Sequence, residues 1–182
     1  MGSSQLDWLK QQLGGSKAVW KVIASDMPIC NSVSDARGFE AFANADDGPP
    51  LGRELELAEL LRFLKKNQIR NVVFLTADVH HAAAIHYHPD RAAFKEFDPF
   101  WEFITGPMHA GSFGPPRIDK TFGPQTIFNS YPKGAKGNLG PAAGMQYFGL
   151  VEIDAKSKTM SVSQHNLAGE RVHSVELAPV MG

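Results

Sequence analysis

The stretch RNVVFLTADVHHAAAIHYH, residues 70–88, decides how this chain folds. Its β-branched and aromatic run at 71–75 predicts a strand that is buried on both faces. The run then breaks, so Asp78, Val79 and His80 follow the carboxyl end of the strand, where open α/β sheets bind their ligands. Side chains two apart on extended backbone project to the same side, so Asp78 and His80 are expected to converge while Val79 faces away. A carboxylate and an imidazole placed in this way are a candidate metal-binding pair.

A second interpretation of these residues stays open. An Asp-x-His at a strand end is often a turn former or a satisfied polar pair, and short motifs of this kind also match by chance. Four of the seven histidines fall in the same stretch, namely His80, His81, His86 and His88. His86 and His88 alternate with apolar neighbours, which favours a structural role on the polar face of the next strand.

Composition narrows the class of protein. With 182 residues and 43% hydrophobic content, one domain over residues 1–182 is expected. The net charge of −1, from 18 basic and 19 acidic residues, argues against a nucleic-acid-binding surface. No apolar run reaches the roughly 18 residues of a membrane span, and the first residues do not show the charged-then-apolar pattern of a signal peptide. The single cysteine, Cys30, excludes an internal disulfide and is interpreted as a small buried residue.

Helical and strand patterns alternate along the chain. Residues 4–13 begin with an S-x-x-D capping arrangement and show helical spacing of leucines, as do residues 53–66. The predicted strands are 20–24, 71–75 and 100–104, followed by an antiparallel set at 145–154, 159–166 and 171–177. Residues 31–52 and 105–141 are expected to be irregular. The alternation predicts an α/β fold with a mixed sheet, in the broader α+β sense.

Two further polar side chains follow predicted strands. Asp26 comes directly after the strand at 20–24, where a turn or capping role is the alternative to ligand binding. His109 follows the strand at 100–104, where a structural loop histidine is the alternative. In the loop between, Asp46 and Asp47 are candidates for contact with substrate or metal, although a solvated acidic turn explains them as well.

Several motifs, in order, carry a family resemblance. They are SKAVWKVIASDMPI at 16–29, DDGPPLGRE at 46–54, TADVH at 76–80, FWEF at 100–103 and GPMHAG at 106–111. Together they resemble the alkaline phosphatase D, or PhoD-like, family of calcineurin-like metallophosphoesterases. The resemblance covers essentially the whole chain and corresponds to the C-terminal part of the family's catalytic domain, an α/β sandwich.

The resemblance implies a metal-dependent phosphoric ester hydrolase that acts on a phosphate ester as alkaline phosphatase or phosphodiesterase. Its family site holds two metal ions, iron with calcium, or zinc or manganese, which activate water for attack on phosphorus. Position by position, Asp78 and His80 match the family's late metal ligands. His109 and Asp26 match strings found in one branch and are candidate catalytic residues. Family members are usually exported to the periplasm or the extracellular space.

The family's early metal ligands have no counterpart in this sequence, which leaves two functions open. The chain is either a phosphoesterase, or a part of one, or else a catalytically incompetent remnant that binds metal or anions weakly. Few ligands per ion predict slow turnover by the isolated chain. Strands that normally pack against the family's upstream half also predict an uncovered apolar face or sheet edge, which favours a homodimer or aggregation.

Overall fold

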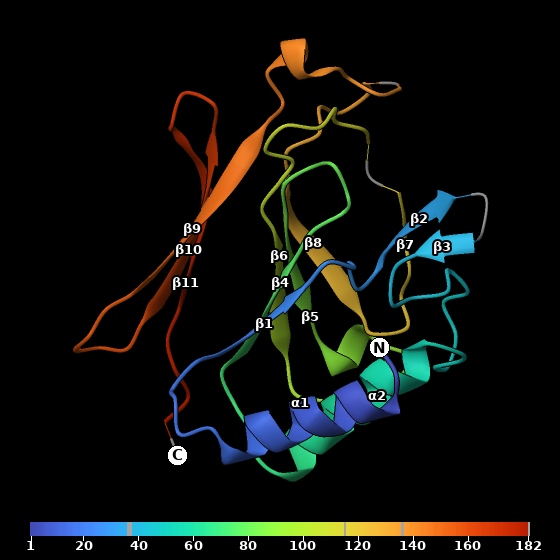
Figure 1. The fold of residues 1–182 in the computed structure, drawn as a ribbon, viewed down its shortest axis with the longest axis vertical. Helices are drawn as coiled ribbons and strands as arrows, with labels where there is room; N and C mark the ends of the chain where they lie inside the picture. Colours follow the sequence, from blue (N-terminus) through green and yellow to red (C-terminus); the bar gives the residue numbers. More distant parts are fainter. Residues whose placement is uncertain (36–37, 115, 136, 182) are drawn as a thin grey trace.

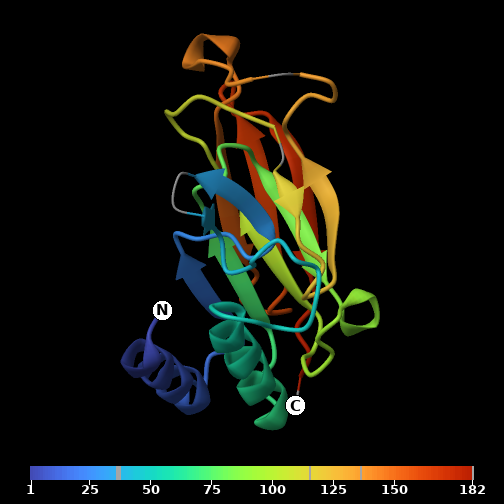
Figure 2. The same cartoon turned by 90° about the vertical axis from the view of Figure 1, so that its right-hand side faces the viewer.

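The computed structural model describes residues 1–35, 38–114, 116–135 and 137–181 (Figure 1). Two α-helices are present within these residues, α1 (Ser3–Gly15) and α2 (Glu54–Lys66), and they lie side by side at one end of the molecule (Figure 2). Two short 3₁₀ turns, η1 (Pro89–Arg91) and η2 (Pro141–Ala143), lie in the connections. No helix in the described part of the chain is long and apolar enough to cross a membrane.

The central element is a mixed five-stranded sheet. Its order is β1 (Lys21–Ser25), β4 (Val72–Thr76), β6 (Phe100–Ile104), β5 (Ala83–Tyr87) and β8 (Pro124–Asn129). The first three strands run parallel, and β5 and β8 are each antiparallel to their neighbours. The predicted mixed α/β fold is therefore confirmed, and the strand expected at 71–75 is shifted by one residue.

Both faces of the middle of this sheet are covered, which explains the uninterrupted apolar runs in β4 and β6. Phe74 packs with the leucines of α1 and α2 in the larger apolar cluster. Its neighbour Val73 faces the other way and packs with Met160 and Val162 of a second sheet. That sheet is antiparallel, in the order β11 (Arg171–Leu177), β10 (Met160–Asn166), β9 (Tyr147–Ile153), as the sequence predicts.

Specific contacts fix the second sheet against the first. The side-chain amide of Gln164 in β10 donates hydrogen bonds to the carbonyl oxygens of Ala83 and Ile104, each at 2.8 Å. A Cβ atom on Gly149 would lie 2.3 Å from Cγ2 of Thr105, so glycine allows β9 to approach the end of β6 closely. The antiparallel sheet therefore packs against the end of the central sheet where β6 terminates.

The two stretches expected to be irregular contain strands. A small third sheet has the order β3 (Gly38–Glu40), β2 (Asn31–Asp35), β7 (Arg117–Ile118), and β8 also lies in a predicted loop. These expectations were wrong because β2, β3 and β7 are short, β8 is largely exposed, and β7 and β8 pair with partners distant in sequence. The predicted capping box is also absent, since α1 begins at Ser3 with Gly2 as its N-cap and without a side-chain cap.

Candidate functional site

The parallel strands bring the candidate residues to one edge of the central sheet. Ser25 at the end of β1 is in register with Thr76 at the end of β4, and Thr76 is in register with Ile104 at the end of β6. Asp26 directly follows β1, whereas Asp78 and His109 come shortly after β4 and β6. All three strands therefore deliver polar side chains to the edge where such sheets bind ligands.

The β4 tip forms a tight turn rather than continuing as extended backbone. Asp78 is exposed and has a φ of 70°, a left-handed conformation that aspartate tolerates better than most residues. Val79 is fully buried behind it. The Asp78 carboxylate makes no hydrogen bond or ion pair with any other described residue. The turn is thus anchored by the buried side chain of Val79 and exposes a carboxylate that is available to bind a ligand.

His80 is held in one orientation. Its Nδ1 lies 2.7 Å from the carbonyl oxygen of Gly111, and its ring stacks on Phe113 with centroids 4.5 Å apart and planes at 27°. A carbonyl oxygen can only accept, so Nδ1 is the donor of this hydrogen bond, and in the neutral tautomer that it selects Nε2 carries the lone pair. This arrangement is the usual one for a metal-binding histidine. His80 therefore fits a metal ligand through Nε2.

Asp26 and His109 lie on the same edge, and both are exposed. The Asp26 carboxylate accepts a hydrogen bond from the backbone N–H of Met27 at 3.0 Å, as a turn-forming aspartate does. His109 makes no hydrogen bond or ion pair with another described residue. Their catalytic roles stay predictions, as do those of Asp78 and His80 as metal ligands.

His81 was grouped with its neighbours by sequence but differs from them in its surroundings. It is 1% exposed, and neither ring nitrogen makes a hydrogen bond of ordinary geometry with the described residues. Burial lowers its pKa to about 4, although the nearby backbone of Phe113 opposes that shift. His81 is therefore a neutral imidazole under the β4 tip.

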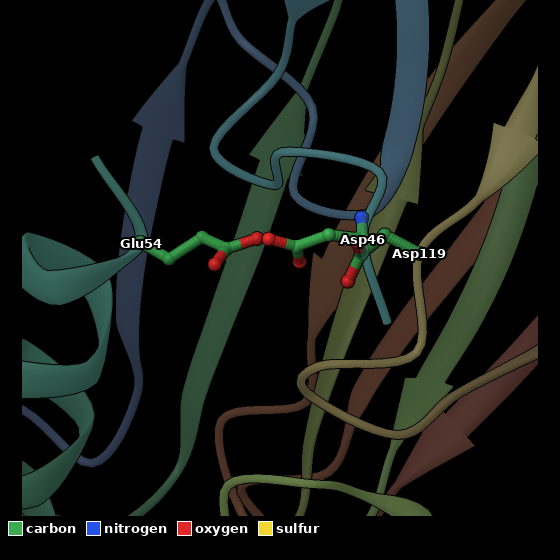
Figure 3. Close-up of side chains that lie close together, drawn as sticks. All are labelled: Asp46, Glu54 and Asp119. Carbon is green, nitrogen blue, oxygen red and sulfur yellow. The ribbon is translucent and has the colours of Figure 1, made fainter. Parts of the chain in front are cut away.

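A group of three carboxylates lies elsewhere, between the loop after β3, the start of α2 and the segment after β7 (Figure 3). Asp46, Glu54 and Asp119 each offer an oxygen, and these oxygens lie within 4.8 Å of one another. In the described part of the chain, this is the one set of three such residues close enough to hold a metal ion. Asp78 and His80 gather no third ligand of this kind there.

The two buried carboxylates of this acidic triad accept hydrogen bonds from backbone N–H groups of the protein itself. Asp119 accepts the backbone N–H groups of Asp46, Asp47 and Thr121 at 2.8–3.2 Å. Glu54 accepts those of Asn44 and Leu51 at 2.7 and 3.0 Å, and burial raises its pKa. The triad therefore ties down the loop before α2. Sequence reasoning singled out Asp46 but missed Glu54 and Asp119, because their approach depends on contacts distant in sequence.

Glu102, a third buried carboxylate, lies in the central sheet behind the site edge. Glu102 in β6 accepts hydrogen bonds from the backbone N–H of Ile29, the hydroxyl of Thr76 and the hydroxyl of Tyr87. Burial raises its pKa. Cys30 is also buried, as expected, and burial raises the pKa of its thiol well above the usual range. Glu102 joins three strands and the segment after β1.

Comparison with known proteins identifies the class to which this architecture belongs. The model of the family described as PhoD-like phosphatase matches residues 1–164, so the chain belongs to this family of phosphoric ester hydrolases. Among individual proteins, the chain is similar to alkaline phosphatase D of Bacillus subtilis (strain 168), with 33% identity over 121 residues. That match covers 63% of this chain and 19% of the relative, so it spans about a fifth of the relative's length.

Proposed function

We propose that the chain supplies one half of a metal-dependent phosphoesterase site, in which Asp78 and His80 bind metal and a phosphate ester is the substrate. The observation that carries the proposal is the β4 tip. An unengaged carboxylate stands two residues from an imidazole whose Nδ1 is already bonded to a carbonyl oxygen. Oxygen and imidazole nitrogen donors suit iron, zinc and manganese.

Metal ions, when bound, would offset the charge of the phosphate group and supply an activated water for attack on phosphorus. The chain's own residues would do the remaining work at the same edge. Asp78 and His80 would hold the metal, and His109 would donate a proton to the leaving oxygen. Asp26, at the end of the adjacent strand β1, would orient the substrate or the attacking water. Phosphomonoesters and phosphodiesters both fit this chemistry.

The proposal is tested first by metal content and then by hydrolysis. We expect purified chain incubated with iron, calcium, zinc or manganese to retain metal, and Asp78→Ala to lower the affinity at least about tenfold. Asp7→Ala is the matched control, because Asp7 is an exposed aspartate in α1 without a described partner. Equal metal content in the wild type and Asp78→Ala would refute the assignment of the site.

Turnover of an aryl phosphate and of a bis-aryl phosphodiester is expected to be slow. The β4 tip gathers no third His, Cys, Asp or Glu ligand among the described residues, and a two-ion site needs several ligands for each ion. Slow turnover that Asp78→Ala abolishes would support the phosphoesterase. A chain that binds no metal and turns nothing over would instead support the catalytically incompetent remnant.

A further inference from the structure

We propose that Gly111 and Phe113 form a positioning device that fixes the tautomer and the ring orientation of His80. What the device is for rests on the proposed function. Its geometry is observed whether or not the site binds metal. Both residues belong to the segment after β6, whereas His80 follows β4. The device therefore joins two neighbouring strand ends at the site edge.

The hydrogen bond and the ring contact restrict different motions of the imidazole. The carbonyl of Gly111, 2.7 Å from Nδ1, selects the tautomer with hydrogen on Nδ1, because the other tautomer would place two lone pairs together. The ring of Phe113, stacked 4.5 Å away, opposes rotation of the imidazole about its χ2 torsion. Together they leave Nε2 as a lone-pair donor with a fixed direction, as a metal ligand requires.

The segment that carries the device is itself tightly held. Ser112 and Leu139 exchange backbone hydrogen bonds of 2.7 and 2.6 Å, and the Ser112 hydroxyl donates to the carbonyl of Met145 at 2.7 Å. A Cβ atom at Gly111 would lie 2.4 Å from Oδ1 of Asn138 and 3.0 Å from the Leu139 oxygen, so a side chain there would force the Asn138 side chain to move and would crowd the backbone of Leu139. Glycine therefore lets this segment place its carbonyl against His80 without that crowding.

A second histidine in the chain provides an internal comparison. His165 in β10 stacks on Phe148, with centroids 5.1 Å apart, and its Nδ1 lies 3.1 Å from the carbonyl oxygen of Gly169. Its Nε2, however, lies 2.9 Å from the hydroxyl of Ser163, so both ring nitrogens are engaged. The Nε2 of His80 makes no hydrogen bond with any other described residue. The difference separates a structural histidine from one whose second nitrogen is available.

The first experiment is ¹⁵N NMR of the histidine rings in the metal-free full chain, at a pH of about 9, where free imidazole is neutral. We expect His80 to be predominantly protonated on Nδ1. Phe113→Leu and Gly111→Ala should each shift His80 toward a mixture of tautomers, and Phe113→Tyr, which keeps the ring, should restore the wild-type signature. Phe148→Leu is the matched control and should leave the His80 signals unchanged.

The second experiment is calorimetric titration of the same proteins with Zn²⁺. We expect Phe113→Leu and Gly111→Ala to lower zinc affinity about tenfold, the usual loss when the partner of a metal-binding histidine is removed. Phe113→Tyr should regain most of that affinity, and Phe148→Leu should lose none.

The outcomes separate this inference from the proposed function. A wild-type His80 protonated on Nε2 would overturn the positioning device, as would a Phe113→Leu variant with unchanged tautomer and zinc affinity. If the tautomer responds as expected but the wild type binds no zinc, the device stands and the proposed metal site fails.

Discussion

Glu102 shows how one buried side chain can couple the fold to pH. The pKa of its carboxyl lies above the ordinary value of 4.5 because burial penalises the charged form. The folded state therefore favours the protonated carboxyl. The contribution of Glu102 to stability is complete below pH 4.5 and declines as the pH rises through the raised folded-state pKa.

We predict that Glu102→Gln flattens this part of the pH dependence. The amide oxygen can still accept from Ile29 and Thr76, and its NH₂ can donate to the oxygen of Tyr87. Urea unfolding between pH 4 and 8 should show a smaller loss of free energy of unfolding with rising pH than in the wild type. Asp7→Asn, at an exposed carboxylate, is the control, and parallel profiles for the wild type and Glu102→Gln would contradict the prediction.

A second prediction concerns how much single members of the acidic triad contribute to stability. Asp119→Ala removes the acceptor of three backbone N–H groups, at a cost of about 3 kcal/mol in the free energy of unfolding. Asp46→Ala, at an exposed member of the triad, should change it by less than about 0.5 kcal/mol. Chemical denaturation of both variants measures the difference. Equal losses would mean that the exposed carboxylate is as necessary to the loop as the buried one.

At the scale of elements, the docking of the antiparallel sheet onto the central sheet is testable through Gln164. Gln164→Leu leaves the carbonyl oxygens of Ala83 and Ile104 without their donor, which should cost about 2 kcal/mol in the free energy of unfolding. Ser174→Ala, on an exposed position of β11, is the control and should be neutral. Urea denaturation is the measurement, and a neutral Gln164→Leu would show that apolar packing alone joins the sheets.

The elements that sequence could predict are those whose pattern is local. β4 and β6 are buried on both faces, so their continuous apolar runs identify them, and the leucine stripe identifies α2. β8 could not be predicted because it is a largely exposed edge strand with polar residues such as Gln125 and Thr126. β2 and β7 could not be predicted because they pair across more than 80 positions of sequence, and a local pattern contains no information about such a pairing.

The same distinction holds for the site. The strand tips that carry Asp26, Asp78 and His109 follow from the positions of the strands, so sequence could place these residues on one edge. The partners of His80 could not be predicted, since the path of the segment after β6 brings Gly111 and Phe113 to the ring. The turn at Asp78 was equally inaccessible, because the sequence argument assumed extended backbone there.

For the whole molecule, the open edge of the central sheet is the feature with the clearest consequence for assembly. β1 pairs with β4 on one side and with no other strand among the described residues, and Val22 on β1 is 45% exposed. An unpaired edge of this kind is a template for strand pairing between chains. A second copy of the chain is the partner expected from the sequence.

We predict that the chain forms dimers at micromolar to millimolar concentration and that Val22→Lys suppresses them, because a lysine on an edge strand disfavours pairing. Light scattering coupled to gel filtration over a range of concentrations measures the effect. Asp7→Lys, on the exposed surface of α1, is the control for added charge. A wild type that stays monomeric at the highest concentration would rule out this mode of association.

The turn after β4 has a practical consequence for genetics. Its apolar anchor, Val79, is buried, while Asp78 is exposed and has no partner among the described residues, so the side chain that anchors the turn and the one proposed to bind metal are different. Alleles that alter Asp78 should accumulate to normal levels in cells but lose the metal binding proposed for this site, whereas those that alter Val79 should be cleared as misfolded chains.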